Sequence, residues 1–509
     1  MNMRKTKIIC TLGPAVDHAE TIERLIRTGM NAARFNFSHG SHAEQLARLN
    51  MFKKVRDTLG APVATILDTK GPEIRIKTFA DGPVTLEQGQ GFILTTDDVP
   101  GDGHRVSVTY ANLHKEVGPG CRILVDDGLI ELRVQKVEGH EIHCEVENGG
   151  PLSSNKSINI PDVHILLPSL TDKDREDLKF AVDNDFDFIA ASFVRKASDV
   201  EDIRAELRKH GGDNIRIIAK IENREGVENL EGIIAASDGI MVARGDLGVE
   251  IPAHEVPILQ KKMIKATIRA GLPVITATQM LDSMIRNPRP TRAEVSDVAN
   301  AVFDGTSCVM LSGETASGKY PIEALSTMVS TVTAAEEAID YWGRFRERSL
   351  LPVVSGISDA ITHSCCLTAM DLNASAILAA TRSGYTAKVI SRFRPACPIV
   401  ALCQNESTRR QLAISWGVHP YLSGEVDSTD RMFSLAVDVA RKENAVQIGD
   451  TVVITAGVPL HNQPDQGPDC GGRPVKTCKK ERITRTGPAP TYAGPVLSEG
   501  PAAPQMVPP

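Results

Sequence analysis

Short runs of apolar residues along this chain repeatedly end in charged or hydroxyl-bearing residues. In the segment 217–223, three apolar side chains alternate with Lys220 and Glu222. Because successive side chains of a strand point to opposite faces, Lys220 and Glu222 face the same way. Placing a lysine and a carboxylate at the end of an apolar strand is costly unless the two groups are paired or functional. The pattern therefore predicts a buried strand with polar chemistry at its carboxyl end.

Five further segments have the same order, with apolar residues first and polar residues last. They span residues 33–40, 63–71, 239–246, 273–279 and 308–314. Helical patterns separate these segments, and strands at 5–14 and ending near Phe193 bring the expected number of strands to eight. Polar groups at the carboxyl ends of such strands are typical of a (β/α)8 TIM barrel, whose active site lies at that end.

The alternation of strands and helices breaks in the middle of the chain. Between 72 and 168 the sequence has short alternating runs, many turn residues and no long helical pattern, which predicts an inserted all-β domain. The barrel would then comprise residues 1–71 and 169–345. Because the insertion follows the third strand, we expect it to cover the catalytic face as a lid.

Two regions follow the barrel. Residues 356–460 contain buried-strand runs separated by helical patterns, which predicts a C-terminal open α/β domain. Its turn at 381–386 opens a helix, which suits phosphate binding through backbone N–H groups or a plain strand–helix connection. Residues 461–509 are rich in proline and glycine, so we expect a disordered tail.

Two short sequence motifs predict where two helices begin. Thr171–Asp174 and Ser198–Glu201 each place a hydroxyl-bearing residue three positions before an acidic one. That spacing is typical of a capping box, in which each side chain bonds the backbone N–H group of the other residue. We therefore expect helices to begin after Thr171 and after Ser198.

Composition narrows the class of protein. The chain has 509 residues, of which 41% are hydrophobic and 24% charged, as in ordinary globular proteins. Its net charge of −7, without a basic stripe, argues against nucleic acid as a partner. No apolar run approaches the length of a membrane span. Ten scattered cysteines without a C-x-x-C pair predict reduced thiols in the cytoplasm rather than disulfides or a zinc site.

Six segments, taken in order, resemble signatures of the pyruvate kinase family. They are RFNFSHG (34–40), LDTKGPEIR (67–75), AKIEN (219–223), ARGDLG (243–248), TQMLDSM (278–284) and MLSGET (310–315). The resemblance covers about residues 4–460, and the break after the third strand matches the family's lid domain. It implies transfer of phosphate from phosphoenolpyruvate to ADP, giving ATP and enolpyruvate, which is then protonated to pyruvate.

The resemblance implies roles for the charged strand ends. Glu222 and Asp246 would bind Mg²⁺, which prefers carboxylates together with substrate oxygens and water. Lys220 would stabilise the charge that develops in the transition state, and Arg34 would clamp the phosphate. Gly245 and Asp246 would contact the substrate, Gly245 through its backbone near the substrate carboxylate. Taken alone, Lys220 and Glu222 also fit a structural ion pair.

The resemblance also implies a potassium site formed by Asn36, Ser38, Asp68 and Thr69. Taken alone, Asn36 and Ser38 fit ordinary turn capping equally well. Glu73 indicates a potassium-dependent member, because potassium-independent members carry lysine at that position.

Further implied roles concern the proton and the nucleotide. Thr278, Ser312 and Glu314 would line the methylene side of the substrate and relay a proton through water, with Thr278 also binding substrate. Without the resemblance, the threonine and serine would be packed strand-end hydroxyls. In the segment 154–159, Ser157 stands where the family usually has glycine. The residues expected to contact the nucleotide are Asn36, His39, Arg75 and Lys156.

Two other functions fit parts of the pattern. A metal-dependent barrel aldolase or lyase acting on a pyruvate-like enolate would not need Arg34, the lid or the potassium residues. A non-catalytic effector-binding or assembly protein would result if an altered C-terminus had disabled the enzyme, but the intact strand ends argue against it.

The resemblance ends near residue 460. It implies a homotetramer and a C-terminal domain that binds a sugar-phosphate effector. In the family the chain continues into a final strand, whereas from His461 this sequence is proline-rich and unrelated, as either a frameshift product or a genuine tail. If that strand is missing, we expect lower stability and weaker effector activation.

Overall fold

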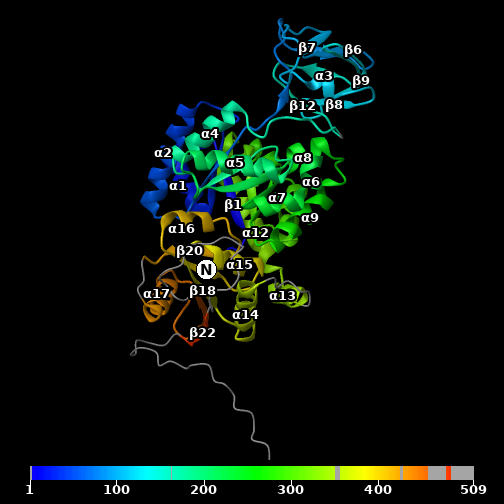
Figure 1. Cartoon of the computed structure of the whole chain (residues 1–509). Coiled ribbons are helices and arrows are strands. Elements are labelled where there is room, and N and C mark those ends of the chain that lie inside the picture. Colours follow the sequence, from blue (N-terminus) through cyan, green and yellow to red (C-terminus); the bar gives the residue numbers. More distant parts are fainter. Residues whose placement is uncertain (1–2, 162, 350–355, 425–427, 457–476, 483–509) are drawn as a thin grey trace, which may run out of the picture.

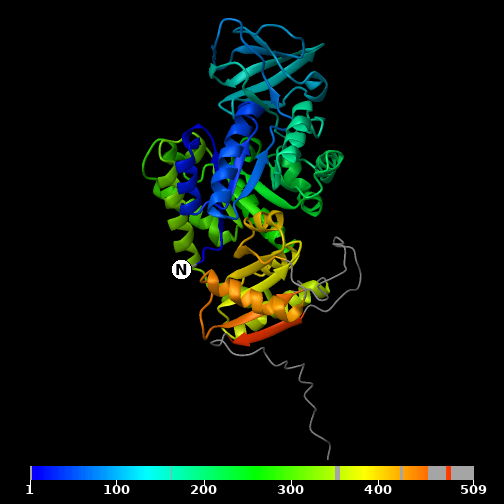
Figure 2. The ribbon, with the colours of Figure 1, turned by 90° about the vertical axis from the view of Figure 1, so that its left-hand side faces the viewer.

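The computed structural model of the chain describes residues 3–161, 163–349, 356–424, 428–456 and 477–482. The fold has three tiers, with a β-rich lid above a barrel and an α/β domain below it (Figures 1 and 2). Each tier has its own hydrophobic core. Among the described helices, none is long and apolar enough to cross a membrane.

The middle tier is a closed barrel of eight strands in the order β1-β17-β16-β15-β14-β13-β3-β2. All neighbouring strands run parallel, and buried side chains such as Ile9, Ile66 and Ile275 fill the interior. The prediction of a (β/α)8 barrel is confirmed. The strands are β1 (Lys7–Leu12), β2 (Ala32–Asn36), β3 (Ala64–Asp68), β13 (Phe188–Ala191), β14 (Arg216–Ile221), β15 (Gly239–Ala243), β16 (Val274–Ala277) and β17 (Cys308–Leu311).

Helices surround the barrel. Thr171 caps α4 in a capping box with Asp174, as predicted. The second predicted box is wrong, because α5 begins at Ala197 and Asp199 instead accepts a hydrogen bond from the Arg195 N–H group. The helices are α1 (Ala19–Thr28), α2 (His42–Leu59), α4 (Asp172–Asp183), α5 (Ala197–Lys209), α6 (Arg224–Glu228), α7 (Leu230–Ala236), α8 (Arg244–Glu250), α9 (Val256–Arg269), α10 (Arg292–Asp304), α11 (Gly313–Ala316) and α12 (Pro321–Glu337), with 3-10 turns η1 (Pro14–Val16) and η2 (Asp282–Ile285). The next helix, α13 (Tyr341–Ser349), leads to the C-terminal domain, where Phe345 packs in the core.

The lid leaves the barrel after β3 and returns before α4. It holds a seven-stranded sheet in the order β4-β12-β8-β9-β10-β6-β7 and a separate β11-β5 pair. Its core includes Phe92, Leu94 and Ile123, so the predicted all-β insertion is confirmed. Its elements are β4 (Ile74–Arg75), β5 (Val84–Leu86), β6 (Gly91–Thr95), β7 (Arg105–Ser107), α3 (Leu113–Glu116), β8 (Arg122–Val125), β9 (Ile130–Glu138), β10 (Glu141–Asn148), β11 (Gly150–Leu152) and β12 (Ser157–Asn159).

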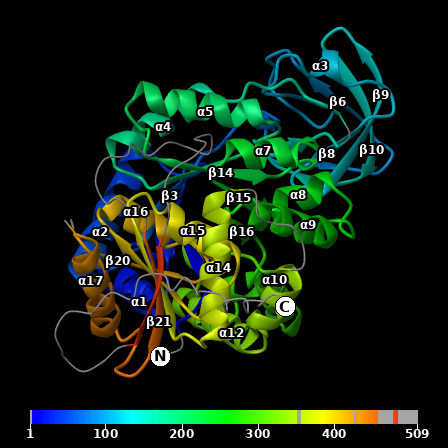
Figure 3. The ribbon, with the colours of Figure 1, turned by 60° about the horizontal axis from the view of Figure 1, so that its bottom comes forward.

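The lowest tier is the predicted C-terminal α/β domain. Its sheet has the order β20-β19-β18-β21-β22. Helices α14 and α15 pack on one face of the sheet and α17 on the other; Figure 3 shows these helices around the sheet from below. The elements are α14 (Ile357–Asp371), β18 (Ala376–Thr381), α15 (Tyr385–Arg392), β19 (Ile399–Cys403), α16 (Glu406–Leu412), β20 (Val418–Leu422), α17 (Thr429–Lys442), β21 (Thr451–Ala456) and β22 (Thr477–Arg482).

The strand β22 lies within the segment expected to be disordered. It pairs antiparallel with β21 and forms the lower edge of the domain (Figure 2). The prediction of disorder is therefore wrong for 477–482, and β21 has an antiparallel neighbour within the segment expected to be unrelated to the family. Backbone groups along the edge of β21 can make this pairing whatever side chains the added strand carries. The rest of the expected tail, 461–476 and 483–509, lies outside the described residues.

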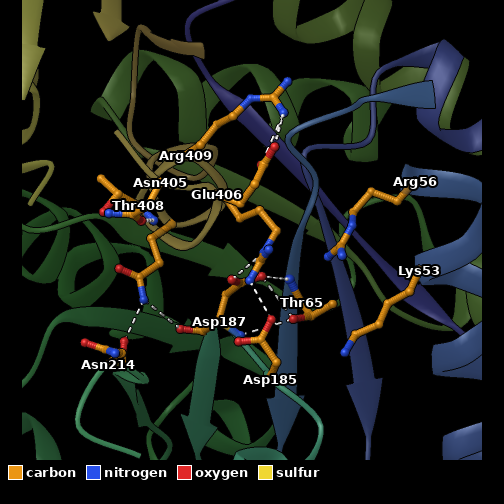
Figure 4. Close-up of polar contacts among 12 residues, drawn as sticks. Lys53, Arg56, Thr65, Asp185, Asp187, Asn214, Asn405, Glu406, Thr408 and Arg409 are labelled. Carbon is orange, nitrogen blue, oxygen red and sulfur yellow. Dashed lines mark hydrogen bonds and ion pairs between the residues drawn. The ribbon is translucent and has the colours of Figure 1, made fainter. Parts of the chain in front are cut away.

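The C-terminal domain contacts the amino-terminal end of the barrel strands. Arg410 on α16 donates to Asp187 at 2.8 Å and to Asp185 at 2.9 Å, just before β13. Figure 4 shows Asp185 and Asp187 close to Thr65. Asp187 also accepts hydrogen bonds from the backbone and hydroxyl of Thr65 on β3, at 2.8 and 3.0 Å. Ile414 packs into the interior core of the barrel. The domain thus contacts β3 and β13 at the ends opposite the predicted chemistry.

Candidate active site

Lys220, near the end of β14, lies at the centre of a polar cluster at the carboxyl ends of the barrel strands. Its Nζ atom donates to the Ser192 hydroxyl at 2.7 Å, and lies 2.8 Å from Glu222 Oε1 and 3.2 Å from Asp68 Oδ1. These partners come from the ends of β3, β13 and β14, which are neighbours in the barrel. The structure therefore brings together two strand ends that the sequence singled out, Asp68 after β3 and the Lys220 and Glu222 pair at the end of β14.

Arg34 on β2 faces the same cluster. Its Nε atom lies 2.6 Å from Asp68 Oδ2, and its Nη1 donates to the Thr11 hydroxyl at 3.0 Å. Burial alone would raise the pKa of Asp68, but the positive charges of Arg34 and Lys220 outweigh burial and hold that pKa below its usual value. Asp68 is therefore an ionised carboxylate that orients two cations.

Glu222 and Asp246 both line a cavity of about 260 Å³ between the lid and the barrel. Glu222 directly follows β14, and its Oε2 accepts a hydrogen bond from the Phe193 N–H group at 2.6 Å. Asp246 lies in the first turn of α8 rather than at the end of a strand. Burial raises the pKa of Glu222; Lys220 opposes this rise and the carboxylate of Asp246 adds to it.

This pair of carboxylates fits a partial metal site. Among the described residues, no group of three or more His, Cys, Asp or Glu side chains is arranged to hold a metal ion. Mg²⁺, however, is commonly held by one or two carboxylates while substrate oxygens and water complete its coordination. Glu222 and Asp246 meet that requirement, because both face a cavity and a cation would offset the repulsion between them.

The four residues expected to bind potassium lie on the adjoining ends of β2 and β3. Asn36 is opposite Asp68 in the strand register, and the Phe37 N–H group donates to the Asp68 carbonyl at 2.9 Å. Asn36 Oδ1 accepts a hydrogen bond from the Ser38 N–H group at 3.1 Å, which is the turn capping that its residue type favours. Together with Thr69, these side chains offer oxygen atoms, which suit a hard cation.

Thr278 follows β16 with a left-handed backbone, φ 65°, which is rare for a β-branched residue. Its hydroxyl accepts a hydrogen bond from the Gly245 N–H group and donates to the Ala277 carbonyl, both at 2.7 Å. Arg244 donates to the Thr278 carbonyl at 2.6 Å. These contacts hold the strained turn in place. They also join Thr278 to Gly245, two residues that the sequence placed at the substrate.

Ser312 and Glu314 meet after β17. Glu314 accepts hydrogen bonds from the N–H groups of Leu281 and Ser312, at 3.0 and 2.7 Å. Burial raises the pKa of Glu314, and these N–H groups oppose the rise. Within the described part of the chain, the buried hydroxyl of Ser312 has no hydrogen-bond partner. Such an atom is suited to a site that a ligand or a water molecule completes.

Two of the expected nucleotide contacts lie together in the lid. Arg75 on β4 forms an ion pair with Glu73 at 2.7 Å, and Lys156, which precedes β12, pairs with Asp126 at 2.8 Å. The strands β4 and β12 are hydrogen-bonded neighbours. His39 is exposed on the loop that follows β2, which belongs to the barrel rather than the lid.

Sequence reasoning missed Ser192 and Phe193. The strand that ends there was recognised, but no role was given to the polar residue that follows its apolar run. The same pattern that singled out the other strand ends, an apolar run closed by a hydroxyl, is present at Ser192. The role of the Phe193 backbone N–H group carries no side-chain signal and becomes visible only in the fold.

Comparison with known protein families shows which family this chain belongs to. Residues 3–325 match the family described as pyruvate kinase, barrel domain, and residues 359–465 match pyruvate kinase, alpha/beta domain. The chain belongs to the pyruvate kinase family. It is therefore a phosphotransferase, and members of this family use a divalent and a monovalent cation.

Similar proteins cover most of the chain. The pyruvate kinase of Clostridium acetobutylicum is 50% identical over 460 residues, which cover 90% of this chain and 97% of that protein. That of Geobacillus stearothermophilus is 49% identical and covers 90% of this chain, with 78% of its own length matched. The crystal structure of a pyruvate kinase from Cryptosporidium parvum superposes with a TM-score of 0.88 at 39% identity, covering 94% of this chain and 96% of that one.

Proposed function

We propose that this chain transfers the phosphoryl group of phosphoenolpyruvate to ADP, giving ATP and pyruvate as the final step of glycolysis. The observation that carries the proposal is the position of Lys220, a buried ammonium group held by Asp68, Ser192 and Glu222 at the mouth of the barrel. Phosphoryl transfer depends on positioning and charge neutralisation more than on covalent chemistry. A preorganised cation beneath a lid meets that need.

The proposed substrate contacts follow from the orientation of the Lys220 and Arg34 side chains. Lys220 faces the transferring phosphoryl group and the enolate that develops as the phosphoryl group leaves. Arg34 binds the phosphate through its planar fork. Because Asp68 already holds both side chains, little reorganisation is needed when charge develops in the transition state. The Gly245 backbone contacts the substrate carboxylate, and Thr278, whose hydroxyl accepts a hydrogen bond from the Gly245 N–H group, lines the methylene side of the substrate.

Two metal ions, Mg²⁺ and K⁺, complete the proposed site. Glu222 and Asp246 hold Mg²⁺, and Asn36, Ser38, Asp68 and Thr69 hold K⁺. When bound, these ions neutralise phosphate charge on the two substrates. The support is the chemistry of the donor sets: two carboxylates at a cavity in one case and oxygen atoms from two adjoining strand ends in the other.

The proton and the nucleotide use two different groups of residues in this proposal. Thr278, Ser312 and Glu314 relay a proton to enolpyruvate through water, and the Ser312 hydroxyl, which has no hydrogen-bond partner among the described residues, supports this role. Nucleotide phosphates replace Glu73 and Asp126 as partners of Arg75 and Lys156, beside Asn36 and His39. Arg75 and Lys156 each form an ion pair with a carboxylate in this structure. Each side chain therefore keeps an anionic partner when a nucleotide phosphate takes the place of the carboxylate.

Regulation, assembly and location are proposed on the basis of family membership. A sugar phosphate would bind at the turn 381–386, where Gly384 adopts φ 83° before α15. The part of the expected effector site that follows residue 456 lies outside the described residues. We also propose a homotetramer located in the cytoplasm. The eight cysteines with described side chains are free thiols, which agrees with a reducing compartment.

The test is release of pyruvate from phosphoenolpyruvate and ADP, measured with and without Mg²⁺ and with K⁺ or tetramethylammonium as the monovalent ion. We expect turnover that requires ADP and Mg²⁺ and increases with K⁺. Pyruvate release without ADP would indicate hydrolysis and contradict the proposal. A folded chain that releases no pyruvate under any of these conditions would contradict it as well.

A further inference from the structure

One carboxylate holds both connections between the lid and the barrel. Asp174, in the first turn of α4, accepts a hydrogen bond from the Gly71 N–H group on Oδ1 at 2.9 Å. Its Oδ2 accepts hydrogen bonds from the backbone and hydroxyl of Thr171, at 2.9 and 2.6 Å. Gly71 is the last residue before the expected lid, and Thr171 follows the lid's return to the barrel. The carboxylate is buried, with 1% of the residue exposed.

Gly71 is packed against the end of β13. Its backbone is left-handed, φ 73°, and a Cβ atom at this position would lie 2.8 Å from the Ser192 Cβ atom and 3.0 Å from the Phe193 ring. Ser192 accepts a hydrogen bond from Lys220, and the Phe193 N–H group donates to Glu222. The position of Gly71 therefore bears directly on the two residues that contact the proposed phosphoryl site.

The same helix turn also holds the loop that follows β2. Lys173 donates to the Phe37 carbonyl at 2.6 Å, one residue before Ser38. Asp177, one turn further along α4, contacts His42 Nε2 at 2.5 Å. In addition to the lid connections, the beginning of α4 thus contacts the loops that follow β2 and β3, the two strands at whose ends the four proposed potassium ligands lie.

We propose that Asp174 is a positioning residue that couples the hinge of the lid to the phosphoryl-transfer site. It contacts no proposed ligand and acts through Gly71, which it fixes against Ser192 and Phe193. Because both connections bond one buried carboxylate, lid movement is confined to the segment between Gly71 and Thr171. The role in catalysis rests on the proposed function, whereas the mechanical role does not.

The test compares Asp174→Ala with two matched variants. Asp172→Asn removes a negative charge from the same helix turn at an exposed residue, and Thr171→Val removes the capping hydroxyl while keeping the Thr171 N–H group. For Asp174→Ala we expect the K⁺ concentration at half-activation and the KM for ADP to rise about tenfold, because the Gly71 N–H group loses its charged acceptor. Both control variants should stay within about twofold of wild type. Asp174→Asn replaces Asp174→Ala if the latter does not fold.

Hydrogen–deuterium exchange supplies a readout that needs no activity. We expect peptides covering 69–73 and 168–172 to exchange faster in Asp174→Ala and to be unchanged in Asp172→Asn. Exchange in Asp174→Ala at the wild-type rate at both connections would overturn the proposal. An equal rise of the K⁺ concentration at half-activation in Thr171→Val would also overturn it, because loss of the helix cap alone would then explain the effect. If the wild type releases no pyruvate but both connections exchange faster in Asp174→Ala, the proposed function is contradicted and the hinge role still holds.

Discussion

Lys220 on β14 and Asp68 on β3 form a buried ion pair across the intervening strand β13, with 3.2 Å between Nζ and Oδ1. The side chain that bridges the gap is Ser192, which accepts a hydrogen bond from Lys220 at 2.7 Å and donates one to the Thr69 carbonyl at 2.7 Å. The cluster therefore depends on three consecutive strands, and a change in any one of them should alter the position of the lysine.

Ser192→Ala tests this dependence. The substitution removes one hydrogen bond to a charged group while leaving the ion pairs of Lys220 in place. We expect kcat/KM for phosphoenolpyruvate to fall about tenfold or more, with little change in melting temperature. The control is Ser198→Ala, at an exposed position in the first turn of α5. Wild-type kinetics in Ser192→Ala would show that the hydroxyl does not position Lys220.

The pH dependence of metal binding tests the environment of Glu222. Burial raises the pKa of this carboxyl group, so protons compete with a divalent cation at higher pH than they would at an ordinary glutamate. We therefore expect the affinity for Mn²⁺, measured by electron paramagnetic resonance without substrates, to fall as the pH is lowered from about 8 to about 6. Glu222→Gln should bind Mn²⁺ more weakly, and its affinity should vary less over the same range. An identical slope in both proteins would exclude Glu222 as the titrating ligand.

The junction between the barrel and the C-terminal domain provides a stability test. Arg410→Met leaves Asp187 buried without its cationic partner, and we expect a loss of about 3–5 kcal/mol in the free energy of unfolding. Asp185→Ala removes the other, largely exposed partner of Arg410 and should cost less than about 1 kcal/mol. Urea denaturation measures both. Similar losses in the two variants would mean that burial does not distinguish the two ion pairs.

Truncation tests the role of β22. A chain ending at residue 456 lacks the strand that pairs with β21, so an unpaired sheet edge becomes available for association. We expect this chain to melt at a lower temperature and to aggregate on heating, whereas a chain ending at residue 482 should behave like the full-length protein. Equal melting temperatures for the two truncated chains would show that β22 contributes nothing to stability.

Much of the fold and of the candidate site could be predicted because strand alternation is a local property. The apolar-to-polar order at Lys220 and Glu222, and again at Asp68, sets which side chains face the barrel mouth before any long-range contact is known. The missed features depend on contacts between distant segments. Asp174 shows local capping chemistry in the sequence, but its bond to Gly71, across the whole lid, does not. The ion pair between Arg410 and Asp187 likewise joins two domains.

Two errors have local causes. Ser198 has the spacing of a capping box, but the upstream Arg195 N–H group engages Asp199, so α5 begins two residues earlier than the motif suggests. The segment 477–482 lies in a proline- and glycine-rich region whose composition predicts disorder. Its pairing with β21 uses backbone groups that side-chain composition does not report.

The most direct test of the account is pyruvate release by Lys220→Met, which replaces the central cation with an uncharged side chain of similar length. Lys196→Met, at an exposed lysine shortly after β13, is the control. With Mg²⁺ and K⁺ present, we expect the wild type and Lys196→Met to turn over phosphoenolpyruvate and ADP, and Lys220→Met to lose at least about 100-fold in kcat. Turnover by a folded Lys220→Met close to that of the wild type would contradict the central role of this residue.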